Sequence, residues 1–211
     1  MRTVDGTSIE TIRRLPAYHS IAQKLNLEGT IYVSSALIAS HLNIDPIIVR
    51  KDLEQAGIEG KPKLGYETVA IINEIAEFLG WKRRDRLILA GCGALGSALL
   101  GYSGFKERGY DLVAGFDINP EIIGTQIHGK DILPLDKMVN LCRRMHITTG
   151  IIAVPASVAQ SIADLMIESG IVGIWNFSPV PLKVPQNIVV QQENLVSSLA
   201  ILMKKLEKEV K

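Results

Sequence analysis

The sequence predicts an α/β fold in which a parallel sheet follows a small helical domain. Three observations support this. An apolar strand turns on glycines into a helix at residues 87–96, helical patterns fill the segment before it, and strand-length apolar runs alternate with helices after it. The chain has 211 residues, 47% of them hydrophobic, which is enough for two small domains with separate cores.

The first expected elements are two helices joined by a short extended segment. The first helix ends near Asn26. Residues 30–33 are β-branched and aromatic, so they predict an extended piece. Ser34 or Ser35 can then cap a second helix that runs through Leu42. The apolar residues that recur at helical spacing in the first helix are Tyr18, Ile21, Ala22 and Leu25.

A third helix follows a tight turn. Asp45 is a strong N-cap and Pro46 favours the first helical position, so this helix is expected from Pro46 to about Ala56. It carries Arg50 and Lys51. A short helix, a tight turn and a second helix with basic residues form a helix-turn-helix, a motif that reads DNA in the major groove. The alternative is an ordinary solvated basic pair on a small helical domain.

The glycine-bounded stretch 57–66 predicts a β-hairpin wing beside this motif. Lys61 and Lys63 lie near its tip, where they can reach a minor groove or phosphates. A fourth helix is expected over residues 69–79. Since the net charge of the chain is only +1, any DNA-binding surface must be local.

The glycine turn that follows fits the dinucleotide fingerprint G-x-G-x-x-G at Gly91, Gly93 and Gly96. The first glycine permits the tight turn, the second lets the backbone approach a pyrophosphate, and the third lets helix and strand pack closely. Asp117 ends the next apolar strand, where a carboxylate can accept from a ribose and disfavour a 2′-phosphate. We expect NADH/NAD+ as the cofactor; the alternative is a glycine turn without a ligand.

The rest of the chain predicts the remaining sheet and a terminal helix. Strands are expected at 112–116, 150–155, 171–177 and 187–191. Helices are expected over 135–145 and from a cap at Ser157 to Ser169, and the last one begins at Glu193. The terminal helix must bury an apolar stripe against its own sheet or a partner subunit. The stripe consists of Leu195, Leu199, Leu202, Met203 and Leu206.

Composition argues against several classes of protein. No apolar run approaches a membrane span, and the N-terminus lacks a secretion signal, so a cytoplasmic protein is expected. Cys92 and Cys142 are expected to be buried thiols, and the scattered histidines predict no metal site. No second domain with a catalytic acid and base follows the fingerprint, which favours sensing over turnover and predicts no catalytic residue.

With these motifs in view, the chain resembles the Rex family of redox-sensing transcriptional repressors over nearly its whole length. Members bind operator DNA when NADH is scarce and release it when NADH binds. The resemblance implies a homodimer joined through a swapped C-terminal helix. It is carried by Ser34-Ser35, Val49-Arg50-Lys51-Asp52-Leu53, Gly65-Tyr66, Gly91-x-Gly93-x-x-Gly96-Ser97-Ala98-Leu99, Phe116-Asp117, Val154-Pro155 and Asn176-Phe177-Ser178-Pro179.

The motifs and the resemblance together assign domains and candidate residues. The expected parts are a winged-helix domain (1–80), a linker (81–85), a Rossmann NAD(H) domain (86–192) and a dimerisation helix (193–211). The residues expected at DNA are Ser34, Ser35, Arg50, Lys51, Lys61 and Lys63. Those expected at NAD(H) are Gly91, Cys92, Gly93, Ala94, Leu95, Gly96, Tyr102, Asp117, Ile118, Val154, Pro155, Asn176, Phe177, Ser178 and Pro179. The resemblance implies that residues 176–179 sense the nicotinamide and that Tyr102 relays to the partner's last helix.

The chain departs from the family pattern at the DNA region and at one described ion pair. Most members read Ser-Tyr-Phe where residues 54–56 are Glu54, Gln55 and Ala56, and Arg-Gly where this wing has Pro62 and Lys63. One described member has an Arg–Asp pair between its first and last helices, and the matching positions here are Ser20 and Asn194. These departures concern the operator sequence and the switch. Two alternative hypotheses for the function remain. The first is an NAD-dependent oxidoreductase, and the second is a dinucleotide- or CoA-binding protein that has lost operator binding.

Overall fold

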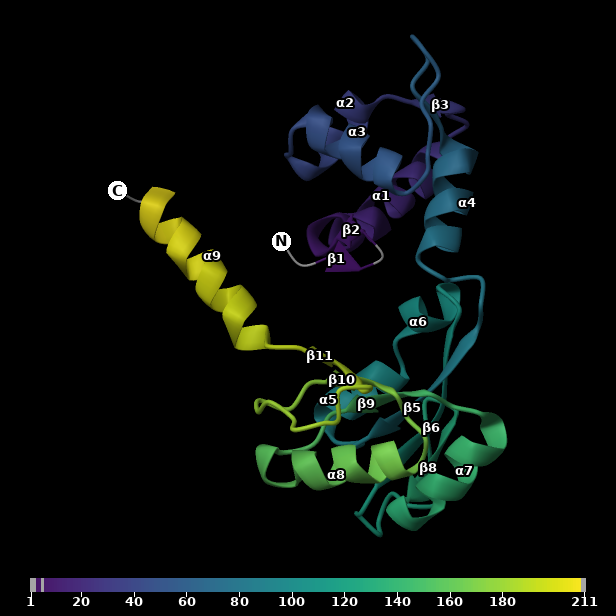
Figure 1. Ribbon diagram of the computed structural model, residues 1–211, viewed down its shortest axis with the longest axis vertical. Helices are drawn as coiled ribbons and strands as arrows, with labels where there is room; N and C mark the ends of the chain where they lie inside the picture. The colour runs from purple at the N-terminus through teal and green to yellow at the C-terminus, as the bar shows by residue number, and fades with distance from the viewer. Residues whose placement is uncertain (1–2, 5, 210–211) are drawn as a thin grey trace. The chain divides into compact units, whose positions relative to one another are not determined.

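The computed structural model describes residues 3–4 and 6–209 and divides into two units, Met1–Arg83 and Arg84–Lys211 (Figure 1). The division falls inside the segment expected as a linker. Asp85, expected to be the last linker residue, is instead the first residue of strand β5 (Asp85–Ala90). The α/β fold with a preceding winged-helix unit is confirmed.

The first unit is a helical bundle with two very short ladders. Its core is formed by fully buried side chains that include Leu15, Tyr18, Ile38, Leu53 and Ile71. In chain order its elements are β1 (Thr3–Val4), β2 (Thr7–Ser8), α1 (Ile9–Leu27), β3 (Tyr32–Val33), α2 (Ser35–Leu42), α3 (Pro46–Gln55), β4 (Tyr66–Glu67) and α4 (Thr68–Phe78).

Local capping explains where the helices of this unit begin. The hydroxyl of Ser34 accepts from the backbone N–H of Leu37 at 3.1 Å, and Asp45 Oδ1 accepts from that of Ile47 at 2.7 Å. Both caps were predicted, with Ser34 rather than Ser35 in the role. α1 begins well before the apolar pattern that revealed it, because Ser8 caps it.

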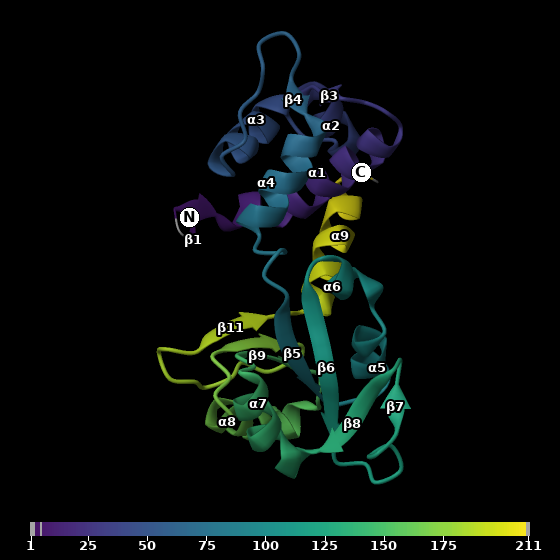
Figure 2. The same ribbon diagram turned by 90° about the vertical axis from the view of Figure 1, so that its right-hand side faces the viewer.

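The wing is not the two-stranded hairpin expected over residues 57–66. β3 pairs instead with β4, and within the loop a single bridge joins Lys61 to Gly65. Pro62 has no N–H to donate to a ladder, which disfavours strand pairing at the tip. Lys63 there has a left-handed backbone with φ +63°. Figure 2 shows this loop extending away from the helices of its own unit.

The second unit is a Rossmann sheet with the strand order β11-β10-β9-β5-β6-β8-β7. All neighbouring pairs are parallel except β7–β8. The order reverses between β5 and β9, which is the switch point where ligands bind in such sheets. Its other elements are α5 (Ala94–Leu100), α6 (Ser103–Glu107), β6 (Tyr110–Asp117), β7 (Gln126–Ile127), β8 (Lys130–Pro134), a 3₁₀ turn (Leu135–Lys137), α7 (Met138–Met145), β9 (Thr149–Ile152), α8 (Ala156–Glu168), β10 (Gly173–Asn176), β11 (Val189–Gln192) and α9 (Leu195–Glu209).

Three expectations for this unit are corrected, one for a helix cap and two for the bounds of elements. Ser157 does not cap α8: Pro155 does, because its extended backbone places Ala156 at the first helical position. The helix expected over 135–145 begins as a 3₁₀ turn and becomes α-helical only at Met138. The β7–β8 hairpin was not predicted, and strand β10 ends at Asn176, one residue before Phe177.

Apolar clusters cover both faces of the sheet. Figure 2 shows α7 and α8 on one side and α5 and α6 on the other, in agreement with the two clusters they form with the strands. α9 differs, since its apolar side chains Leu199, Leu202, Met203 and Leu206 are all about half exposed. The side chain of Leu195 and residues 210–211 of the predicted helix lie outside the described part. Nowhere in that part is there a helix with both the length and the apolar character needed to cross a membrane.

Candidate functional site

The three fingerprint glycines differ in what a side chain at each position would contact. Gly91 has φ +92°, and a Cβ there would lie 2.5 Å from the carbonyl oxygen of Ala153. A Cβ on Gly96 would lie 1.8 Å from the carbonyl oxygen of Gly91. A Cβ on Gly93, in contrast, would meet nothing within 4 Å. The fold itself therefore requires the first and third glycines, whereas the second leaves the turn open to an approaching ligand.

The carboxylate of Asp117 is hydrogen-bonded to the backbone of this turn. Its Oδ2 accepts from the backbone N–H of Cys92 at 2.7 Å, and its Oδ1 accepts from those of Ile118 and Asn119 at 2.8 and 2.9 Å. A carboxylate offers about four acceptor positions. One position on Oδ2 remains for a hydroxyl donor, so the side chain is both oriented and still able to receive a ligand hydroxyl.

A pocket of about 460 Å³ opens at the carboxyl ends of β5, β6 and β9. Its size is typical of small-molecule sites. It brings together six of the candidate residues: Gly91, Gly93, Asp117, Ile118, Val154 and Pro155. Its other lining residues were not predicted, and they include Leu135, Val158, Ser161 and Ile162.

The remaining fingerprint residues lie around the turn. Gly93, Ala94 and Leu95 are exposed at the start of α5. Cys92 points inward, with Sγ 3.6 Å from the carbonyl oxygen of Phe116. Burial, and secondarily the charge of Asp117, raises the pKa of the Cys92 thiol to about 12. This thiol is therefore protonated at neutral pH, which fits the expectation of a small buried residue.

The turn at residues 176–179 is tied to the loop that follows β9. Asn176 is fully buried; its Nδ2 donates to Gln192 Oε1 at 2.7 Å and its Oδ1 accepts from the N–H of Ser178 at 3.0 Å. The hydroxyl of Ser178 donates to the carbonyl oxygen of Val154. Phe177 packs on the sheet face that carries α5 and α6. The turn thus lies beside Val154, although it does not line the pocket.

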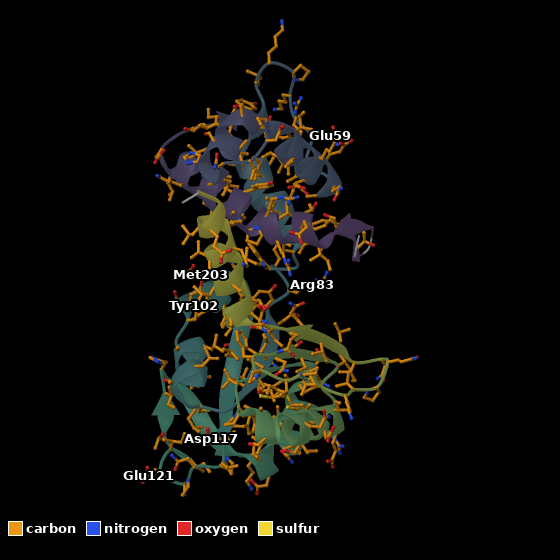
Figure 3. All side chains as sticks on the ribbon, turned by 90° about the vertical axis from the view of Figure 1, so that its left-hand side faces the viewer. Glu59, Arg83, Tyr102, Asp117, Glu121 and Met203 are labelled. Atoms are coloured by element: carbon orange, nitrogen blue, oxygen red, sulfur yellow. The ribbon has the colours of Figure 1, made fainter. Side chains whose placement is uncertain are left out.

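Tyr102 lies apart from that pocket. It is 57% exposed and precedes α6, and Figure 3 shows it well separated from Asp117 within the same unit. A row of aromatic rings nevertheless joins it to the turn. Tyr102 contacts Phe105 at 5.0 Å between ring centroids, Phe105 contacts Trp175 at 5.9 Å, and Trp175 contacts Phe177 at 4.7 Å.

In the first unit, five of the six residues expected at DNA share one hollow of about 490 Å³. It is lined by Ser34, Ser35, Arg50, Gly60, Lys61, Pro62, Lys63, Leu64, Gly65 and Tyr66. Lys51 does not line it, although it is exposed on the same helix. The start of α2, the face of α3 and the wing therefore meet in one concave surface.

Lys61 is held in place by two neighbours on the β3–β4 ladder. Its Nζ donates to the hydroxyl of Tyr32 at 2.9 Å and lies 3.5 Å from Glu67 Oε2. The hydrogen bond with Tyr32, with a smaller part from Glu67, raises the pKa of Lys61. The wing thus presents a charged ammonium at a defined position.

A buried network that the sequence did not reveal fixes α3, the second helix of the predicted helix-turn-helix. Asp52 is 2% exposed and accepts from Arg14 Nε at 2.6 Å, Arg14 Nη2 at 2.9 Å, the hydroxyl of Tyr18 at 2.6 Å and that of Thr11 at 2.8 Å. Burial alone would raise the pKa of Asp52, but these hydrogen bonds outweigh it and hold the pKa below its ordinary value. α1 and α3 are thereby joined through one carboxylate.

Ser20 and Asn194, the residues in place of the described ion pair, each make a local bond. Ser20 donates to the carbonyl oxygen of Pro16 at 3.0 Å, and Asn194 Oδ1 accepts from the N–H of Ser197 at 3.1 Å. In the described part of the chain, no group of three or more His, Cys, Asp or Glu side chains is placed to hold a metal ion.

Comparison with known proteins matches both units. Residues 7–54 match a family described as "Putative DNA-binding protein N-terminus", and residues 82–180 match the "CoA binding domain" family. The redox-sensing transcriptional repressor Rex of Treponema denticola is 39% identical over 91% of this chain and 91% of its own length. That of Porphyromonas gingivalis is 39% identical over 93% and 90%.

Solved structures show the same likeness in three dimensions. The structure of RSP in complex with β-NAD+ and operator DNA has a TM-score of 0.88 and 31% identity, and covers 99% of this chain and 95% of that chain. RSP in complex with β-NADH has a TM-score of 0.85 and 30% identity, covering 99% and 97%.

Proposed function

The chain belongs to the Rex family of redox-sensing transcriptional repressors, and we propose that it represses transcription by binding operator DNA and releases the DNA when NADH binds. The observation that carries this proposal is the pairing of two sites in one chain. A basic hollow lies on a winged-helix unit, and a glycine turn with an oriented carboxylate lies on a Rossmann unit.

The dinucleotide site is assigned to the turn and the pocket beside it. The pyrophosphate would lie over residues 91–96, where Gly93 leaves the backbone open. The adenosine ribose would donate to Asp117, and Ile118, Val154 and Pro155 would cover the adenine side. Residues 176–179, held beside Val154, would then meet the nicotinamide.

The DNA site is assigned to the hollow of the first unit. Arg50 and Lys51 on α3 would enter the major groove, with Ser34 and Ser35 at the start of α2 binding phosphate. Lys61 and Lys63 would follow the backbone or the minor groove. In a symmetric dimer the two recognition helices must lie about 34–36 Å apart to occupy successive major grooves.

A binding assay with the full-length protein tests the proposed function. DNA fragments selected on the ligand-free protein would be titrated without ligand and with NADH, NAD+ or CoA. NADH should weaken DNA binding by about 5-fold to 150-fold, the usual range of coupling between sites, and its absorbance should stay constant. Steady loss of NADH absorbance would favour an oxidoreductase, and DNA affinity indifferent to NADH would remove the sensing role.

A repressor of this kind acts in the cytoplasm.

NADH should bind far more tightly than NADPH. Asp117 would lie against the 2′-phosphate of NADPH, and juxtaposed like charges cost several kcal/mol, so we expect at least about a 100-fold difference in Kd. Titration of the wild-type protein with both ligands, followed by protein fluorescence, measures it. Equal affinities would show that Asp117 does not face the ribose.

Lys63 offers a test of the wing in which charge and backbone strain can be separated. Lys63→Ala and Lys63→Gly both remove the ammonium, and glycine also relieves the left-handed backbone by about 1 kcal/mol. In both variants the slope of log Kd against log salt concentration should be smaller by about 0.9, the value for one lost phosphate contact. Lys24→Ala, an exposed lysine of α1, is the matched control and should keep the wild-type slope. A wild-type slope in both Lys63 variants would show that the wing tip does not contact phosphate.

The homodimer is assigned to α9. Leu199 and Leu202 are 57% and 52% exposed on one apolar side of this helix, which a partner subunit would cover. Replacing both with glutamate should yield a monomer by light scattering, since an interface does not bury unpaired charges. Lys205→Glu, on the exposed surface of the same helix, should leave the mass unchanged. An unchanged dimer in the double leucine variant would place the interface elsewhere.

A further inference from the structure

We propose that the indole of Trp175 and the carboxylate of Glu193 form the contact that couples the 176–179 turn to α9. This inference rests on the proposed function, in which ligand at that turn changes the assembly that binds DNA. Trp175 and Glu193 are positioning residues: neither is assigned a contact with NADH or DNA.

The contact is made at the point where the chain leaves the sheet. Trp175 Nε1 donates to Glu193 Oε1 at 3.0 Å, and the backbone N–H of Glu193 donates to the carbonyl oxygen of Asn176 at 2.8 Å. Glu193 directly follows β11 and precedes α9 by one residue, Asn194. Glu193, which leads into α9, is thus hydrogen-bonded to β10 through both its main chain and its side chain.

A second connection runs through Gln192, the last residue of β11. Its Oε1 accepts from Asn176 Nδ2 at 2.7 Å, and its Nε2 donates to the carbonyl oxygen of Ser178 at 2.8 Å. A movement of the 176–179 turn therefore displaces an acceptor and a donor that hold the end of β11. Glu193 is the next residue along the chain.

The aromatic row makes Trp175 responsive to the same turn. Its ring contacts Phe177 on one side and Phe105 on the other, at 4.7 and 5.9 Å between centroids. A shift of the Phe177 ring must move the indole, and the indole carries the N–H that holds Glu193. Among the described residues of α9, the apolar side chains are exposed rather than packed on the sheet. The orientation of α9 therefore depends on the contacts made by Glu193, just before its first residue.

The experiment compares a coupling ratio across variants of the full-length protein. This ratio is the Kd for DNA at saturating NADH divided by the Kd without NADH. Trp175→Phe keeps an aromatic ring but loses the N–H donor, and Glu193→Ala loses the acceptor. For each variant, the Kd for DNA alone and the Kd for NADH alone should stay within about 3-fold of the wild-type values. The coupling ratio should fall to about a third of the wild-type ratio or less. In a double-mutant cycle the two changes together should lose no more than either alone, because they break one contact.

Two controls sharpen the result. Glu193→Gln keeps a carbonyl acceptor for the indole N–H and should retain the wild-type ratio. Trp81→Phe makes the same chemical change in the first unit and should also retain it. Hydrogen exchange at residues 192–197 should change on NADH binding in wild type and not in Glu193→Ala.

Several outcomes would overturn the inference. A wild-type ratio in Trp175→Phe and Glu193→Ala would show that the contact carries no coupling, while the proposed function would stand. Loss of the ratio in Glu193→Gln, or additive losses in the double variant, would show that the hydrogen bond is not the element that acts. A loss of NADH affinity above about 10-fold in Trp175→Phe would assign the indole to ligand binding. A wild-type protein without any NADH effect on DNA affinity is a different result, since that would remove the proposed function itself.

Discussion

Gly93→Ala should yield a folded repressor that binds DNA and no longer responds to NADH. A Cβ at this position meets nothing within 4 Å in the protein, and the backbone there has φ −64°, which any residue can adopt. The same Cβ would stand between the turn and the pyrophosphate. Each backbone hydrogen bond to a charged group lost in this way weakens NADH binding by about 10-fold to 100-fold.

The neighbouring glycines make this prediction specific. Gly96→Ala places a Cβ 1.8 Å from the carbonyl oxygen of Gly91, so it should lower the melting temperature as well as the affinity for NADH. Gly173→Ala, whose Cβ would make only ordinary contacts at 3.6–3.9 Å, should change neither. Calorimetric titration with NADH and thermal unfolding separate the three. Wild-type NADH affinity in Gly93→Ala would show that the cofactor does not cross this turn.

These glycines also show why the fingerprint could be interpreted from sequence. The turn geometry depends on residues close together in the chain, and so do the caps at Ser34 and Asp45. Local chemistry of this kind is visible in a window of a few residues. The family resemblance, which rests on the same short motifs, is confirmed by relatives that cover over nine-tenths of the chain.

What the sequence could not predict depends on contacts between distant residues. Asp52 and Arg14 are 38 positions apart, and nothing in either segment indicates that they meet. The pocket walls at Val158 and Ile162 depend on where α8 crosses the sheet. The two-residue strand β7 exists only because β8 pairs with it, so it has no periodicity of its own.

Tyr102 illustrates the same limit at a candidate site residue. The resemblance placed it with the NAD(H) residues, whereas the structure places it outside the pocket that Asp117 lines. Its connection to the 176–179 turn runs through Phe105, three residues further on in α6, and then through Trp175 of the distant strand β10. The packing of Phe105 on Trp175 is a tertiary contact, and no motif spacing encodes it.

The position of α3, the helix proposed to enter the major groove, depends on a single buried carboxylate. Asp52→Asn keeps the size of the side chain but removes the charge that Arg14 pairs with, and it turns an amide donor toward groups that are themselves donors. Removing one partner of a buried pair costs about 3–5 kcal/mol. Arg14 is 30% exposed and can recover some hydration, so we expect a loss near the lower end, about 3 kcal/mol.

The loss should be confined to the first unit and should depend on pH. In Asp52→Asn, amides of α1 and α3 should exchange hydrogen faster and DNA affinity should fall, while amides of the Rossmann sheet stay protected.

Because the pKa of Asp52 is depressed in the folded protein, the contribution of Asp52 to stability is present above the unfolded pKa of about 3.9 and is lost as pH falls through the folded value. The difference between wild type and Asp52→Asn should therefore shrink below about pH 4. Glu54→Gln, an exposed carboxylate on the same helix, should change stability by less than about 0.5 kcal/mol. Equal stability of Asp52→Asn and wild type at neutral pH would show that the network does not hold α3 in place.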